Sequence, residues 1–79
     1  MNIQIVKVEA GDWEILYKDG EEFTQGHSID YMDVLYAIGE GGTLNYFNTY
    51  VVSDRSIEDM GWCFPPKFSD IPEDAFIEW

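Results

Sequence analysis

Residues 43–52 read TLNYFNTYVV and carry the clearest secondary-structure signal in the chain. The stretch is rich in aromatic and β-branched residues and has no charge, and such residues fit the pleated surface of a strand. Alternation would put Tyr46 and Tyr50 on one face, with Phe47 and Val51 on the other. We therefore predict a strand over residues 43–52 as part of a sheet.

Three further strands are expected upstream, over residues 2–9, 13–17 and 21–25. The first alternates with apolar residues on both sides, so both faces of the sheet should be partly buried. Its two faces carry Ile3 and Ile5 on one side, and Val6 and Val8 on the other. The Asp19-Gly20 pair favours a tight hairpin turn between the second and third strands.

One main helix is expected between the third and fourth strands. Apolar residues recur at helical spacing from Ile29 to Ile38, and Ser28 is a suitable N-cap. Gly39 suits the left-handed position that ends a helix. Residues 39–42 are glycine-rich, but they follow a helix and precede no Lys-Ser or Lys-Thr pair, so we interpret them as a turn and not a phosphate loop.

The last third of the chain predicts short turns instead of long elements. Ser53 can cap a helical turn that ends near Gly61, residues 65–66 are prolines that exclude regular structure, and Pro72 suits the first position of a terminal turn. The expected fold is α+β: a small antiparallel sheet of about four strands, one main helix packed on one face and a loop-rich C-terminal tail. With 79 residues and no linker, we expect a single acidic domain over residues 1–79.

Cysteine usage and hydropathy set the expected compartment. Cys63 is the only cysteine, so the intramolecular disulfides typical of small secreted domains are excluded. The N-terminal residues lack the basic and then apolar pattern of a signal peptide. No apolar run approaches the roughly 20 residues of a membrane span. We therefore expect a cytoplasmic protein that does not associate with membranes.

Few side chains suit catalysis. Cys63 and His27 are the only residues of their types, and a nucleophilic pair would also need a third, orienting group. We expect Cys63 to be a buried structural residue between Trp62 and Phe64, which should close the core of a small domain, and His27 to lie in a loop. Clustered Cys and His ligands for a transition metal are absent from the sequence. The prediction is a protein that is not an enzyme and has no cofactor.

Charge is the extreme property of the sequence. Sixteen acidic residues face four basic ones, which gives a formal net charge of −12. Nucleic acids and anionic membranes both bind most strongly to surfaces rich in Lys and Arg, so this negative charge disfavours direct binding to either. It favours a basic, nucleic-acid-binding protein as the partner, because opposite charges steer encounter. The alternative is that the excess acid serves only solubility.

The acids are densest in the last third, where residues 54–79 carry seven acids and two bases. Three of them fall within residues 54–59, but without the Asp-x-Asp-x-Asp-Gly spacing of a calcium loop, so no metal is expected. Acids together with an aromatic anchor are typical of a binding surface. The predicted partner-binding residues are Asp54, Glu58, Asp59, Asp70, Glu73, Asp74, Glu78 and Trp79.

In size and charge the chain is similar to several unrelated groups of small acidic inhibitors. These include phage proteins that block CRISPR or restriction enzymes, glycosylase inhibitors, and immunity proteins that neutralise nuclease toxins. The resemblance implies a stoichiometric inhibitor, in one form a nucleic-acid mimic, that binds the basic groove of a nuclease or CRISPR effector. It assigns no individual residues. The alternative function is a small accessory or adaptor domain that docks through an apolar aromatic patch.

Overall fold

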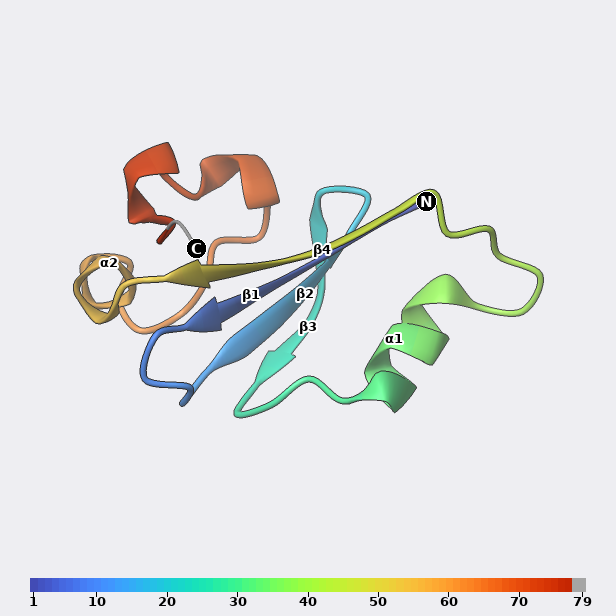
Figure 1. Cartoon of the computed structure of the whole chain (residues 1–79), viewed down its shortest axis with the longest axis horizontal. Helices are drawn as coiled ribbons and strands as arrows, with labels where there is room; N and C mark the ends of the chain where they lie inside the picture. The colour runs from blue at the N-terminus through green and yellow to red at the C-terminus, as the bar shows by residue number, and fades with distance from the viewer. Residues whose placement is uncertain (78–79) are drawn as a thin grey trace.

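The computed structural model describes residues 1–77, which are organised around a four-stranded mixed sheet (Figure 1). The strands are β1 (Asn2–Val8), β2 (Glu14–Lys18), β3 (Glu21–Gly26) and β4 (Tyr46–Val52), in the spatial order β3-β2-β1-β4. The helices are α1 (Tyr31–Ile38), α2 (Asp54–Asp59) and the 3-10 turns η1 (Phe68–Asp70) and η2 (Glu73–Ala75). This arrangement confirms the expected α+β class with four strands and one main helix.

β4 pairs with β1 in parallel, so the expectation of an entirely antiparallel sheet was wrong for this strand. Ile3 lies opposite Phe47 and Val6 opposite Tyr50, whereas β1–β2 and β2–β3 are antiparallel. Parallel neighbours need a crossover of about a dozen residues or more, usually with a helix in it. Residues 27–45, which include α1, provide that crossover from one edge of the sheet to the other.

β1 and β2 bury apolar side chains on both faces of the sheet, as the alternation in the sequence predicted. On one face, Ile3, Ile5 and Leu16 pack against Ala37 of α1. The other face carries a larger cluster of Val6, Val8, Ile15, Tyr17, Val52, Ile57, Phe64, Ile71 and Ala75. The loop-rich C-terminal segment is therefore a packed layer that covers this second face together with α2.

α1 begins later than the sequence suggested, because its N-cap is Asp30 and not Ser28. The Asp30 carboxylate accepts from the Asp33 N–H (3.1 Å), and the Asp33 carboxylate accepts from the Asp30 N–H (3.0 Å), which completes a capping box. The helix ends as predicted at Gly39, whose φ is 75°. Its only acidic residue is therefore already committed to a local structural role.

Aromatic and sulfur-containing residues after α2 divide between core and surface. Phe64 is buried, as predicted, but Trp62 and Cys63 are exposed, so their assignment to the core was wrong. The cause is backbone conformation: Gly61 and Trp62 both have positive φ, 80° and 65°, which turns the chain outward before Phe64 enters the core. Pro72 precedes η2 as its N-cap, one position before the predicted role.

β4 is an edge strand whose outer side is only partly covered. Near its end, the Ile77 N–H donates to the Val51 carbonyl (2.7 Å). In its middle, the Asn48 side-chain carbonyl accepts from the Thr49 N–H (2.9 Å). The segment from Tyr46 to Tyr50 thus has less backbone cover than the end of the strand.

Tyr17 links the sheet to the C-terminal layer. Its side chain is fully buried, and its hydroxyl donates to the Pro65 carbonyl (2.7 Å). Burial, with smaller contributions from the charges of Glu22 and Asp70, raises the pKa of the Tyr17 phenol well above its usual range. Tyr17 is therefore held in its neutral, hydrogen-bonded form.

Replacing Tyr17 with Phe should lower the free energy of unfolding by about 1–3 kcal/mol at neutral pH, because the Pro65 carbonyl loses its donor. The folded-state pKa is raised above the unfolded value of about 10, so the native state holds this proton more tightly. That contribution is fully present below about pH 10 and is lost as the pH rises further. Urea denaturation across this range should show a smaller alkaline loss in Tyr17→Phe than in the wild type, while the raised pKa of Tyr50 contributes a loss in both. Tyr31→Phe, at an exposed tyrosine, is the control and should behave as wild type.

Candidate functional site

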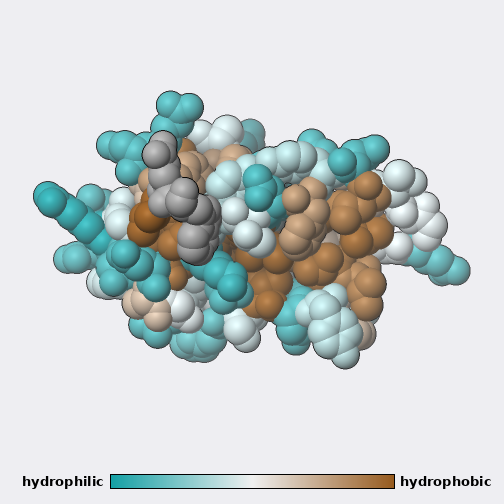
Figure 2. All heavy atoms as spheres, viewed as in Figure 1, coloured by the Kyte–Doolittle hydropathy of each residue, from teal (hydrophilic) through white to brown (hydrophobic). Residues whose placement is uncertain are grey.

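Acidic residues predicted to bind a partner lie on α2, η1 and η2, in the half of the molecule opposite α1 (Figure 1). Figure 2 shows hydrophilic residues crowded over that half, while hydrophobic residues gather over α1 and the start of β4. The six described members are all exposed: Asp54, Glu58, Asp59, Asp70, Glu73 and Asp74. Glu78 and Trp79, which complete the predicted set, lie outside the described residues.

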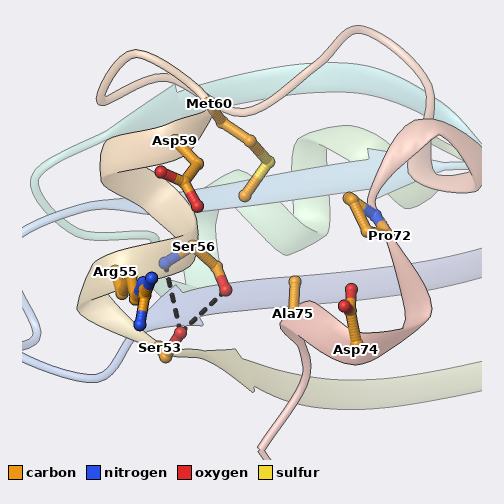
Figure 3. A pocket seen from close by; sticks show the side chains of 8 residues that line it. All are labelled: Ser53, Arg55, Ser56, Asp59, Met60, Pro72, Asp74 and Ala75. Atoms are coloured by element: carbon orange, nitrogen blue, oxygen red, sulfur yellow. Dashed lines mark hydrogen bonds between the residues drawn. The ribbon is translucent and has the colours of Figure 1, made fainter.

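Two of these acids, Asp59 of α2 and Asp74 of η2, line the same hollow of about 410 Å³ (Figure 3). Arg55, one helical turn before Asp59, also lines it. The remaining lining residues are Ser53, Ser56, Met60, Pro72 and Ala75. The hollow therefore combines apolar surface with two carboxylates and one guanidinium, contributed by segments far apart in the sequence.

Hydrogen bonds hold the two sides of the hollow together. The Ser53 N–H donates to the Ala75 carbonyl (3.2 Å), which ties the start of α2 to η2. On α2, the Ser53 hydroxyl accepts from the Ser56 N–H (3.1 Å), the cap that the sequence predicted. Because these hydrogen bonds fix the backbone of α2 relative to that of η2, the positions of Asp59 and Asp74 relative to each other are also defined.

The other four described acids do not line the hollow. Asp54 has a structural role, because its carboxylate accepts from the Ala10 N–H (3.0 Å) in the turn between β1 and β2. Glu58 lies one turn further along α2, and Asp70 and Glu73 belong to η1 and η2. The structure thus brings together two of the six described residues and leaves the others on the surrounding surface.

Trp62 is a further residue of this region, one that the sequence analysis assigned to the core. The Gly61 N–H donates to the Glu58 carbonyl (3.0 Å) and the Trp62 N–H to the Ile57 carbonyl (2.9 Å), the two bonds of a Schellman motif. The second residue of such a motif often packs back on its helix, yet the Trp62 side chain is 61% exposed. A positive φ is uncommon for a bulky residue, and such strain tends to occur at functional positions.

The sequence contains only part of the signal for this exposure. Gly61 directly follows the helical turn that Ser53 caps, so a left-handed exit was predictable, but the exposure of the next residue was not. Hydrophobicity alone predicts that Trp62 is buried, because tryptophan side chains are usually largely buried. The positive φ of Trp62 itself is an additional feature, because a Schellman motif requires a left-handed backbone only at Gly61.

β4 carries a separate polar cluster. The Tyr46 and Tyr50 hydroxyls are 3.1 Å apart, and the Asn48 amide donates to the Tyr46 hydroxyl (2.9 Å). The hydrogen bonds from Tyr50 and Asn48 lower the pKa of Tyr46, while the bond to Tyr46, and then burial, raises the pKa of Tyr50. These bonds fix the orientation of both rings on the sheet.

Within residues 1–77, no three His, Cys, Asp or Glu side chains are grouped so that they could hold a metal ion. No helix in that range combines the length and apolar character needed to cross a membrane. His27 lies in a loop, as predicted, with its ring edge-on to Trp13 at a centroid distance of 5.1 Å.

Comparison of the chain with protein-family models, curated proteins and solved structures found no match. Function therefore has to be inferred from this chain's own residues. The acidic end, defined as the exposed acids of α2, η1 and η2 together with Trp62, is the candidate site.

Replacing Trp62 with Gly should lower the free energy of unfolding by no more than about 2 kcal/mol. Relief of the left-handed strain offsets part of the loss from the buried portion of the ring and from the greater freedom of the unfolded chain. A Trp that closed the core would instead cost about 3–5 kcal/mol. Urea denaturation measures the difference, and a loss above about 3 kcal/mol would contradict the surface assignment.

Gly61→Ala is the matched control for backbone strain. A Cβ on Gly61 would meet nothing within 4 Å, so the substitution tests backbone conformation alone. Its φ of 80° should make the variant less stable than wild type by about 1 kcal/mol. Glycine is thus expected to be tolerated at position 62, while alanine is unfavourable at position 61.

Proposed function

We propose that the chain is a stoichiometric protein inhibitor whose acidic end binds the basic nucleic-acid groove of a nuclease or CRISPR effector and excludes the substrate. The observation that carries the proposal is the hollow that Asp59 and Asp74, from separate elements, line together with the apolar side chains of Met60, Pro72 and Ala75. The net charge of −12 makes encounter with a basic partner electrostatically favourable.

The hollow is chemically suited to a lysine or arginine side chain of the partner. Such side chains have an apolar stem and a cationic head. Met60, Pro72 and Ala75 offer apolar contact to the stem, while Asp59 and Asp74 can accept charge-assisted hydrogen bonds from the head. Arg55 adds one positive charge against these two negative charges, so the hollow keeps a net charge of −1.

Trp62 supplies an aromatic anchor beside the acids. Tryptophan is enriched among residues that dominate binding energy, and its ring face attracts a guanidinium or ammonium group. A groove that grips nucleic-acid phosphates offers such groups. The combination of exposed indole and carboxylates at the end of α2 therefore favours a cationic protein surface as the partner.

Charge density is adequate for competition with nucleic acid. The molecule is 39 Å long, and duplex DNA of that length carries about 23 phosphate charges. The net charge of −12 is about half that number. An inhibitor of this kind competes by occupying the groove and neutralising its cations, and it does not need to reproduce the regular spacing of phosphates.

The first experiment is a pull-down with tagged protein from a lysate of its native host, washed at low and at high salt. A basic nucleic-acid-binding protein retained at low salt and released at high salt is the expected result, because salt screens exposed charge pairs. Duplex or single-stranded nucleic acid added as competitor should displace it. A partner that binds the chain and nucleic acid at the same time would contradict the proposal.

The double variant Asp59→Lys and Asp74→Lys should weaken binding to that partner at least tenfold, equivalent to about 1.4 kcal/mol. Its matched control is Glu21→Lys with Glu40→Lys, which makes the same change in net charge at exposed acids outside the acidic end. The control should change affinity by no more than about threefold, through long-range attraction alone. Equal effects of the two pairs, measured by titration calorimetry, would show that only total charge matters.

A second candidate function is an accessory domain that docks through apolar surface. The observation that favours it is the exposure of large apolar side chains on α1, such as Tyr31, Leu35 and Tyr36. The two candidates differ in their response to salt, because apolar docking is retained or strengthened at high ionic strength. A partner that stays bound in the high-salt wash supports this second function.

A further inference from the structure

We propose that the chain forms a symmetric homodimer through an apolar face made by the outer side of α1 and the start of β4. This dimer face consists of Tyr31, Met32, Leu35, Tyr36, Leu44 and Phe47. It lies away from the acidic end, and the proposal does not depend on the inhibitor function.

α1 is apolar around almost its whole circumference. Its sequence is YMDVLYAI, and its one charged residue, Asp33, is engaged in the capping box. The sheet side uses Val34 and Ala37, which belong to the core cluster of that face. The remaining side exposes Tyr31 by 74% and Tyr36 by 69%. A helix that is apolar all round is normally buried, so its outer side lacks the cover that such a sequence predicts.

The apolar surface continues from the helix onto the sheet. Phe47 lies opposite Ile3 in the parallel register, and Ile3 packs toward α1, so Phe47 projects on the same side of the sheet. Leu44 precedes it in the connection from α1. Figure 2 shows hydrophobic residues gathered over this region. The helix and the strand therefore contribute to one face.

The exposed area is sufficient for a dimer. The exposed fractions of the six side chains correspond to roughly 650 Å² if each large side chain offers about 200 Å². Two copies that cover each other would then bury about 1,300 Å², within the range of about 1,200–2,000 Å² found for specific, stable interfaces. A monomer seldom exposes a contiguous apolar patch larger than a few hundred Å².

Charge placement favours a second copy over a basic protein at this face. β4 has no charged residue, and Asp33 is held in its capping box, so a cationic partner would find few carboxylates to pair with. The acids of α2, η1 and η2 lie toward the other end of a 39 Å molecule. Two copies can therefore meet at the apolar face with their acidic ends apart. Repulsion between two chains of net charge −12 remains, and salt should weaken it.

α1 also has a suitable shape for self-packing. Tyr31 and Leu35, and likewise Met32 and Tyr36, are four residues apart and form two parallel ridges on the exposed side. Ridges of this spacing interdigitate with those of a second helix. A two-fold axis through the contact makes both copies use the same residues, so the assembly closes as a dimer.

The test is sedimentation equilibrium of the whole chain up to about 100 μM, above the micromolar dissociation constant expected of the weaker interfaces in this size class. We expect the average mass to shift from that of a monomer to that of a dimer as the concentration rises. The dissociation constant of the dimer should be lower at 1 M salt, where the Debye length is about 3 Å, than at 0.15 M salt, where it is about 8 Å. A chain that stays monomeric at every concentration and at both salt levels would overturn the proposal.

A variant pair ties the dimer to this face. Leu35→Gln with Phe47→Thr retains residue types suited to helix and strand and should weaken the dimer at least tenfold. Trp62→Gln, at an exposed apolar residue of the other end, is the control and should dimerise as wild type. Equal dimerisation of the double variant and wild type would exclude this face as the interface.

Folding of the variants is checked independently by far-UV circular dichroism and by the concentration dependence of the melting temperature. A dimer melts at higher temperature as concentration rises, whereas a folded monomer does not. If the double variant does not fold, Tyr36→Gln, at a strongly exposed residue of the face, provides the same test.

A monomer that binds a different protein through this face would overturn self-association and support the accessory-domain function. Groove binding depends on Asp59 and Asp74 and weakens with salt, so failure of either proposal is distinguishable from failure of the other.

Discussion

The burial of β1 and β2 on both faces of the sheet is the constraint on which the rest of the structure depends. Ile3 and Ile5 need cover on one side and Val6 and Val8 on the other, so a chain of 79 residues has to supply three layers. The C-terminal segment forms the more complete outer layer, with Ile57, Phe64, Ile71 and Ala75 in its core. α1, with eight residues, forms the thinner one. The unequal thickness of these layers accounts for the apolar surface that is left around α1.

Much of the fold could be predicted from residue patterns because those patterns record burial and local caps. Alternation in β1 showed that both faces would be buried, and Ser53 and Gly39 marked helix boundaries through local hydrogen bonding and a left-handed backbone. The parallel pairing of β4 could not be predicted in this way. It depends on α1 carrying the chain across the sheet, and the strand's own residues fit either direction of pairing.

The candidate site was less accessible to sequence reasoning. The density of acids after residue 53 indicated a candidate region, but not which carboxylates share a surface. Asp59 and Asp74 are brought together by the hydrogen bond between Ser53 and Ala75, which is a tertiary contact without a sequence motif. Asp54, which charge counting treated like the others, instead secures a turn through Ala10. The exposure of Trp62 accompanies a positive φ at Trp62 itself, which residue type does not indicate. Counting charges and rings therefore gives the chemistry of the surface, while its geometry requires the folded backbone.

The outer edge of β4 can pair with another chain wherever the C-terminal layer does not cover it. Tyr46 to Val52 is an uncharged, aromatic and β-branched strand, the composition from which cross-β fibrils are built. On this edge, the Thr49 N–H donates to the Asn48 side chain, and the Val51 carbonyl accepts from the Ile77 N–H. Detachment of residues 75–77 would free the far end of the strand and lengthen the template available to another chain. Residues 75–77 therefore cover part of this edge, and a change that breaks their hydrogen bonds to Val51 and Ser53 would leave more of the strand's backbone unpaired.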